Sequence, residues 1–129
     1  MTVVLDTHVL VWHASGSDKL SENARQAIAS AGTCLVSAIS AWEIGMLVSK
    51  GRLSLSRDVS EWIQIAGTLP KIRWVPVDPG LAVTATRLPG DFHGDPADRL
   101  ITATALSVGA PLVSADQRIR NYRHVKSVW

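Results

Sequence analysis

Four acidic residues of this chain share one kind of position, the junction between an expected strand and an expected helix. Two follow strands and two begin helices; they are Asp6 and Asp116, and Glu43 and Asp98. Because ligands in open α/β sheets bind outside the carboxyl ends of the strands, we expect the four to meet at one sheet edge. Four carboxylates there repel one another unless a hard cation such as Mg²⁺ or Mn²⁺ binds their oxygens. The pattern therefore indicates a metal-assisted site.

Asp6 and Glu43 also have ordinary structural explanations. Asp6 is suited to cap a helix that starts at Thr7, and Ser40-x-x-Glu43 has the form of a capping box. The residues one helical turn from Glu43 are apolar, however, and a carboxylate on a buried stripe is costly unless it is paired or binds a cation. The sequence leaves both interpretations open.

The later acids can be explained by local structure as well. Asp95 is the natural N-cap of a helix whose first residue is Pro96, and Asp98 lies in its first turn, where the helix dipole favours an acid. Asp116 can serve as a turn or cap residue. Asp98 nevertheless continues an apolar stripe through Ile101, so we expect it on the face toward the sheet, near the same edge.

Other chemistries find little support. The single cysteine, Cys34, lies in an apolar run and predicts a packed thiol, and the four histidines are scattered. Of these, His93 is the one that the loop before Asp95 brings near the acids. The glycines occur singly, so no phosphate-binding loop is present, and a G-x-S-x-G elbow is absent.

Composition sets the class of protein. With 129 residues, of which 47% are hydrophobic, we expect a single domain over residues 1–129 with a core of useful size. The formal net charge is only +2, so nucleic-acid binding has to come from a local patch. One cysteine is compatible with a reducing cytoplasm. We expect no signal peptide, no membrane contact and a cytoplasmic location.

Strands and helices alternate along the chain, which predicts a mostly parallel sheet covered by helices on both faces. Strands are expected at Val3–Leu5, Thr33–Ser37, Ile72–Val77 and Leu112–Ser114, with an edge strand within His124–Val128. Helices are expected from Thr7, Ser21, Ser40, about Val59, Leu81 and Pro96, with a helical turn from Asp116.

Five motifs, taken together and in this order, resemble a known family. They are Leu5-Asp6-Thr7-His8 with Leu10 and Trp12; Ser37-Ala38-Ile39-Ser40-x-Trp42-Glu43-Ile44; Gly51-Arg52-Leu53; Asp95-Pro96-Ala97-Asp98-Arg99-Leu100-Ile101; and Leu112-Val113-Ser114-x-Asp116. The pattern resembles the PIN domain and, more narrowly, the VapC toxins of bacterial VapBC toxin–antitoxin modules. The resemblance implies a three-layer α/β/α fold with a mostly parallel sheet of four to five strands.

The resemblance also implies an activity, that of a metal-dependent endoribonuclease leaving a 5′-phosphate and a 3′-hydroxyl. By position, the family's acidic cluster corresponds to Asp6, Glu43, Asp98 and Asp116, as catalytic residues and as ligands of Mg²⁺ or Mn²⁺. Asp95 is an additional acid that assists or only caps its helix. Two hydroxyl residues near these acids, Thr7 and Ser114, are expected to support the carboxylates. Ser114 stands where the family often has Thr.

The substrate and the partners follow from the same resemblance. RNA phosphates need cations, and Arg99 and Arg118, beside the last acids, are the better candidates, whereas Arg120 and Arg123 are better explained as solvated surface. A cognate VapB-type antitoxin is expected to cover an apolar groove, and the protein is expected to be a homodimer.

Two alternatives belong to other classes. One is a non-catalytic RNA- or protein-binding PIN module, against which the intact acid set argues. The other is a phosphotransfer domain, such as a receiver or a haloacid-dehalogenase-type phosphatase. Such a phosphatase needs a second Asp two positions after the first, where this chain has His8.

Overall fold

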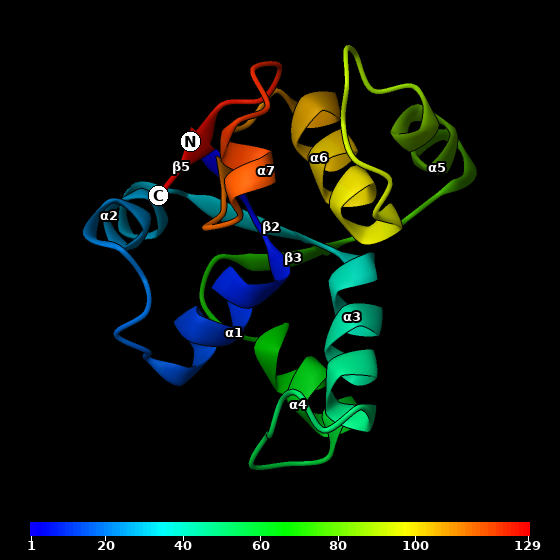
Figure 1. Ribbon diagram of the computed structural model, residues 1–129. Coiled ribbons are helices and arrows are strands. Elements are labelled where there is room, and N and C mark those ends of the chain that lie inside the picture. Colours follow the sequence, from blue (N-terminus) through cyan, green and yellow to red (C-terminus); the bar gives the residue numbers. More distant parts are fainter.

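The fold is built on one sheet of five strands, in which every pairing is parallel (Figure 1). The computed structural model describes residues 1–129. The strand order across the sheet is β3-β2-β1-β4-β5, so the first strand lies in the middle. The strands are β1 Thr2–Leu5, β2 Thr33–Ser37, β3 Ile72–Val75, β4 Leu112–Val113 and β5 Ser127–Val128.

Seven helices connect and cover these strands (Figure 1). They are α1 Thr7–Ser15, α2 Glu22–Ser30, α3 Ala38–Ser49, α4 Val59–Ala66, α5 Pro79–Thr86, α6 Pro96–Val108 and α7 Gln117–Arg120. The predicted three-layer α/β/α fold with a parallel sheet is confirmed. None of the helices has the length and hydrophobicity that crossing a bilayer requires.

Strand β1 is buried on both faces, as its unbroken apolar run predicts. Val3 and Leu5 point into one core cluster together with residues of α1 and α2, whereas Val4 points into a second cluster with Ile101 of α6 and Ile119 of α7. Each cluster lies between the sheet and the helices that cover one of its faces. Helix α5 lies outside α6 and packs against it through a small third cluster around Ala85.

The carboxyl end of β1 lies at the point where the strand order reverses, with β2 on one side and β4 on the other. Leu5 pairs with Val36 of β2 on one side and with Val113 of β4 on the other. The backbone N–H of Asp6 still donates to the carbonyl of Val113 at 3.0 Å, so Asp6 is held at this point of the sheet. In open α/β sheets such a switch point leaves a crevice that binds ligands.

The start of α3 differs from the prediction. The helix begins at Ala38, and its N-cap is Ser37, whose hydroxyl accepts from the N–H of Ile39 at 3.3 Å. Ser40 therefore lies within the first turn of the helix, where it is fully buried, and it is not the N-cap. The predicted capping box with Glu43 is wrong for this reason. Strand β3 also ends at Val75, two residues earlier than expected.

Candidate active site

The four predicted acids come from four elements and line one pocket of about 270 Å³ at the carboxyl edge of the sheet. Asp6 follows β1, Glu43 lies on α3, Asp98 is in the first turn of α6, and Asp116 precedes α7. Asp95 also lines this pocket, which we call the acidic pocket. Its remaining lining residues are Thr7, His8, Val11, Trp12, Leu47, Leu53 and Arg118.

Asp6 is the most deeply buried of the acids, with 3% of its surface exposed. One carboxylate oxygen, Oδ1, accepts from the N–H of Thr7 at 2.8 Å, so Asp6 does cap α1. The other, Oδ2, accepts from the hydroxyl of Ser114 at 2.6 Å. His8 lies 3.6 Å from the same oxygen through Nδ1, and its Nε2 accepts from the N–H of Ala115. That acceptor role leaves the ring proton on Nδ1, facing Asp6.

Glu43 is held by a chain of two hydroxyl groups. The Thr7 hydroxyl donates to Oε1 of Glu43. Because a hydroxyl has only one proton to give, the Ser40 hydroxyl, 2.8 Å away, must donate to Thr7 in turn. Burial raises the pKa of Glu43 to about 7, the bond from Thr7 opposes that rise, and the nearby carboxylates, Asp6 and Asp98 foremost, add to it.

The carboxylate of Asp98 contacts two side chains, one from the loop before α6 and one from α7. Its exposed fraction is 7%, and Oδ2 lies 2.7 Å from Nε2 of His93 and 3.4 Å from the guanidinium of Arg118. Burial raises the pKa of Asp98, the hydrogen bond with His93 lowers it, and repulsion from Asp6 and other acids raises it further, so the net direction is upward. His93 is thus near the acids, as its loop predicted.

Asp116 is the least buried of the four acids, and Arg118 offsets its negative charge most fully. Its side chain caps α7 by accepting from the N–H of Arg118 at 2.8 Å, and the Arg118 guanidinium lies 3.4 Å from Oδ2. Burial alone would raise the pKa of Asp116, but the hydrogen bonds and the charge of Arg118 hold it below the ordinary value. Arg118 therefore bridges Asp98 and Asp116, and it is the predicted cation that does face the acidic pocket.

The other two predicted site residues have mainly structural contacts. Asp95 caps α6 by accepting from the N–H of Asp98 at 3.1 Å, while still lining the pocket. The Arg99 guanidinium donates to the carbonyls of Ala85, Phe92 and His93. Arg99 does not line the acidic pocket, and its hydrogen bonds hold the loop that carries His93; its contact with an RNA phosphate stays a prediction.

Two residues of this site were missed from the sequence. Ser40 reads as a cap, and nothing in its own helix indicates the bond to Thr7 across 33 residues. His8 could have been found, since two positions after a strand-end Asp its ring returns to the same sheet edge. As the side chains lie, no three His, Cys, Asp or Glu residues form a ready-made group of metal ligands. The acidic carboxylates are instead turned toward donors of the protein.

Comparison with known families decides the relationship. The PIN domain model matches residues 3–125. The chain belongs to the PIN domain family. A curated relative, ribonuclease VapC22 of Mycobacterium tuberculosis, is 42% identical over 127 residues, which are 98% of this PIN domain and 96% of the relative.

Solved structures share the fold at low sequence identity. VapBC2 from Rickettsia felis, bound to a DNA fragment from its promoter, contains a chain with a TM-score of 0.68 and 18% identity, covering 98% of this PIN domain and 97% of that chain. FitAcB from Neisseria gonorrhoeae gives 0.66 and 18%, with 97% and 95% covered. A toxin–antitoxin complex from Klebsiella pneumoniae gives 0.65 and 16%, with 95% and 94% covered.

Proposed function

We propose that this PIN domain is a metal-dependent endoribonuclease and the toxin of a type II toxin–antitoxin module. The observation that carries the proposal is the convergence of four carboxylates from four elements on one pocket at the switch point of the sheet. A 42% identical relative over nearly the whole chain is named a ribonuclease, which supports the same chemistry. The substrate is RNA, and the bond that is hydrolysed is a phosphodiester.

The acidic pocket fits Mg²⁺ or Mn²⁺ by its chemistry. Its donors are carboxylate oxygens, which hard divalent cations prefer. Burial is the main cause of the raised pKa values of Glu43 and Asp98, and repulsion from the neighbouring carboxylates, which a bound cation would relieve, adds to it. Arg118, placed between Asp98 and Asp116, supplies part of the missing positive charge, and its side chain is more than half exposed, so it is free to turn away. We assign Asp6, Asp98 and Asp116 as metal ligands, with Glu43 as a further ligand.

The residues around the pocket divide the remaining work. A bound cation supplies activation of water and stabilises charge on the leaving 3′ oxygen. Glu43, as a further ligand, is placed to orient the attacking water. Thr7 and Ser114 fix the orientation of Glu43 and Asp6 through their hydroxyl groups. Arg118 is suited to contact the phosphate that is cleaved.

The proposed partners are a VapB-type antitoxin and a second copy of the chain. Two of the structures with the same fold are named VapBC2 and a toxin–antitoxin complex, which supports an antitoxin partner here. Trp42 exposes 60% of its surface on α3, directly before Glu43. A large apolar side chain so exposed is suited to contact with a partner, although Trp42 does not itself line the acidic pocket.

The test is induction of the protein in a bacterial host, with growth and new RNA 5′ ends followed in the same culture. Wild type is compared with Asp6→Asn and Asp98→Asn, and with Asp18→Asn as a control, since the Asp18 carboxylate is fully exposed and does not line the acidic pocket. We expect wild type and Asp18→Asn to arrest growth and produce discrete cuts that the other two variants lose. Circular dichroism of the purified variants verifies that they are folded.

The opposite result favours the alternative. If folded Asp6→Asn and Asp98→Asn arrest growth as strongly as wild type, the acids are not the active site. The protein would then act as a non-catalytic RNA- or protein-binding PIN module. Retention of RNA binding without cleavage in purified wild type would identify the RNA-binding form of that module.

A further inference from the structure

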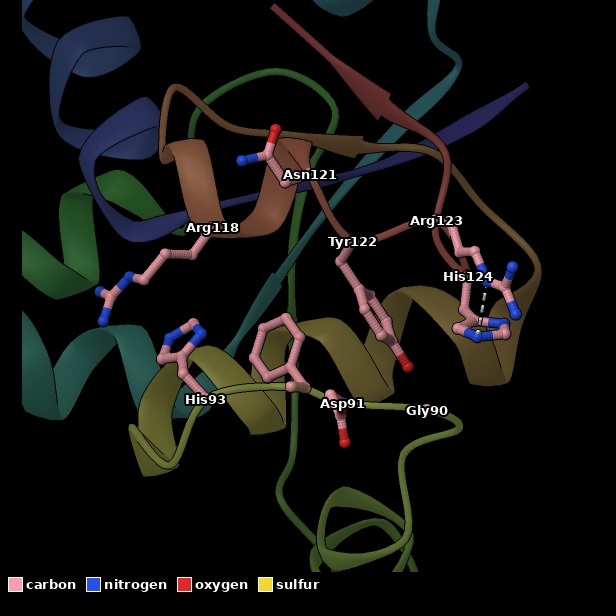
Figure 2. A pocket seen from close by; sticks show the side chains of 9 residues that line it. Gly90, Asp91, His93, Arg118, Asn121, Tyr122, Arg123 and His124 are labelled. Carbon is pink, nitrogen blue, oxygen red and sulfur yellow. Dashed lines mark hydrogen bonds between the residues drawn. The ribbon is translucent and has the colours of Figure 1, made fainter.

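A second hollow of about 600 Å³ lies next to the acidic pocket. Two segments form it, the loop before α6 with Phe92 and His93, and the end of α7 with the turn that follows it (Figure 2). Its volume is within the range of sites that hold a molecule of nucleotide size. We call it the basic pocket because its charged side chains are mostly cationic, as described next.

An arginine with a histidine beside it stands at each end of the basic pocket, with aromatic rings between the two ends. Figure 2 shows Arg118 and His93 facing each other at one end and Arg123 with His124 at the other. In Figure 2 the ring of Tyr122 lies between the two ends, and the ring of Phe92 packs against it edge to face, with 4.8 Å between the ring centroids. An apolar floor between two positive ends suits a base or ribose with a phosphate on each side.

At the end of the basic pocket formed by Arg123 and His124, the positive charge of Arg123 is not paired with a carboxylate. Arg123 is exposed and makes no ion pair, and its one side-chain hydrogen bond is a weak one of 3.5 Å to His124. The backbone also approaches closely here, since a Cβ on Gly90 would lie 3.0 Å from Nε2 of His124. Asp91 is the only carboxylate of the pocket, and in Figure 2 its side chain points away from the ring of Tyr122.

The two pockets are joined by one shared residue and one hydrogen bond. Arg118 lines both of them, and His93 of the basic pocket is hydrogen-bonded to Asp98 of the acidic pocket. A strand whose cleaved phosphate lies at the acids and Arg118 can therefore reach the basic pocket without leaving the surface.

We propose that the basic pocket binds the nucleotide next to the cleaved phosphodiester of single-stranded RNA, with Arg123 contacting the following phosphate. The inference rests on the proposed ribonuclease function and deepens it by naming where the substrate continues. It also changes the interpretation of Arg123, which the sequence placed on solvated surface. Arg120, by contrast, is exposed on α7 and lines neither pocket, so it provides a control with the same charge.

The experiment compares Arg123→Gln with Arg120→Gln in two assays. Binding of a labelled single-stranded RNA of about 12 nucleotides is measured across a salt series in the Asp6→Asn background, which keeps the RNA intact, with Asp98→Asn as a second background. Cleavage of RNA below saturation is measured in the otherwise unchanged protein. We expect Arg123→Gln to weaken binding about tenfold and to reduce the slope of log affinity against log salt by about 0.7, one phosphate contact.

Each other outcome has a distinct meaning. Arg120→Gln should match its parent in both assays. If Arg123→Gln also matches its parent while wild type cleaves RNA, the basic pocket does not hold the substrate and the ribonuclease proposal stands. If wild type cleaves no RNA and neither background binds it, the proposed function fails and the pocket assignment fails with it. If both arginine variants weaken binding equally, the effect is one of general charge and the pocket assignment is overturned.

Discussion

The hydroxyl of Ser114 donates a hydrogen bond of 2.6 Å to Oδ2 of Asp6, a residue 108 positions earlier in the chain. The same oxygen of Ser114 accepts from the N–H of Asp116 at 3.0 Å. One buried hydroxyl group thus links the acids that follow β1 and β4, two neighbouring strands of the sheet. This link sets the spacing of two proposed metal ligands without taking part in ligation.

Replacement of Ser114 tests this link. Ser114→Ala leaves a buried carboxylate without one of its donors, so we expect the free energy of unfolding to fall by about 1–3 kcal/mol. We also expect RNA cleavage to fall about tenfold, because Asp6 loses its fixed orientation. Thermal unfolding and cleavage assays measure the two effects. Ser114→Thr keeps the hydroxyl and should retain more activity than Ser114→Ala; equal activity of Ser114→Ala and wild type would contradict the role.

Glu43 should make the metal-free protein less stable at high pH. Its pKa in the folded protein is about 7, above the ordinary value of 4.5, so folding favours the protonated form. The stabilisation is complete below pH 4.5 and is lost as the pH rises through 7. Glu43→Gln cannot ionise, so with chelator present we expect it to melt above wild type at pH 8. After allowance for its partial exposure, the gain is about 1 kcal/mol, or roughly 3 °C.

The pH series gives this prediction its control. The advantage of Glu43→Gln should shrink toward pH 5, where the wild-type carboxyl is already protonated in the folded state. Glu22→Gln, on the exposed first turn of α2, removes one charge elsewhere and should not reproduce the trend. An advantage of Glu43→Gln that is the same at pH 5 and pH 8 would show that packing, and not ionisation, is its cause.

Metal should stabilise the protein through the acidic pocket. Because a ligand that binds only the folded state adds free energy of unfolding, Mg²⁺ or Mn²⁺ at a hundredfold excess over its Kd should add about 2.7 kcal/mol. Differential scanning fluorimetry with added metal and with chelator measures this. Asp6→Asn and Asp98→Asn should lose most of the shift, and chelator should stop RNA cleavage in wild type. Cleavage that persists in excess chelator would refute metal dependence.

Much of the fold and the convergence of the acids could be predicted because they depend on local rules. The unbroken apolar run of β1 requires burial on both faces, and an acid at its carboxyl end must lie at the switch point. Asp6 shows that the two interpretations of the sequence can coexist, since Oδ1 caps α1 and the residue also lines the acidic pocket. Local rules set the position of the residue, and that position is compatible with both roles.

The sequence was least informative where tertiary contacts decide the start of a helix or the direction of a side chain. Ser37 and Ser40 are both good capping residues, and only the buried bond from Ser40 to Thr7 shows which one lies inside the helix. Arg99 follows Asp98 directly, but one residue along a helix turns the side chain by about 100°. That rotation directs Arg99 to the loop carbonyls and away from the acids. Neighbours in sequence are thus poor evidence of neighbours in a site.

Arg99 provides a test that separates positioning from substrate binding. Its guanidinium holds three carbonyls of the preceding segments at 2.8–3.1 Å and so fixes the loop that brings His93 to Asp98. Because Lys cannot reproduce this fork of donors, we expect Arg99→Lys to lower the free energy of unfolding by about 2 kcal/mol and to reduce cleavage. The salt dependence of RNA binding should stay unchanged.

Arg118→Gln is the matched comparison for Arg99, since the same salt series should show a slope reduced by about 0.7 for this variant. Its exposed side chain bridges Asp98 and Asp116 without supporting any loop, so its melting temperature should change little. A reduced salt slope in Arg99→Lys, with an unchanged melting temperature, would instead restore Arg99 as a phosphate contact. The pair of measurements therefore assigns each arginine to the RNA or to the fold.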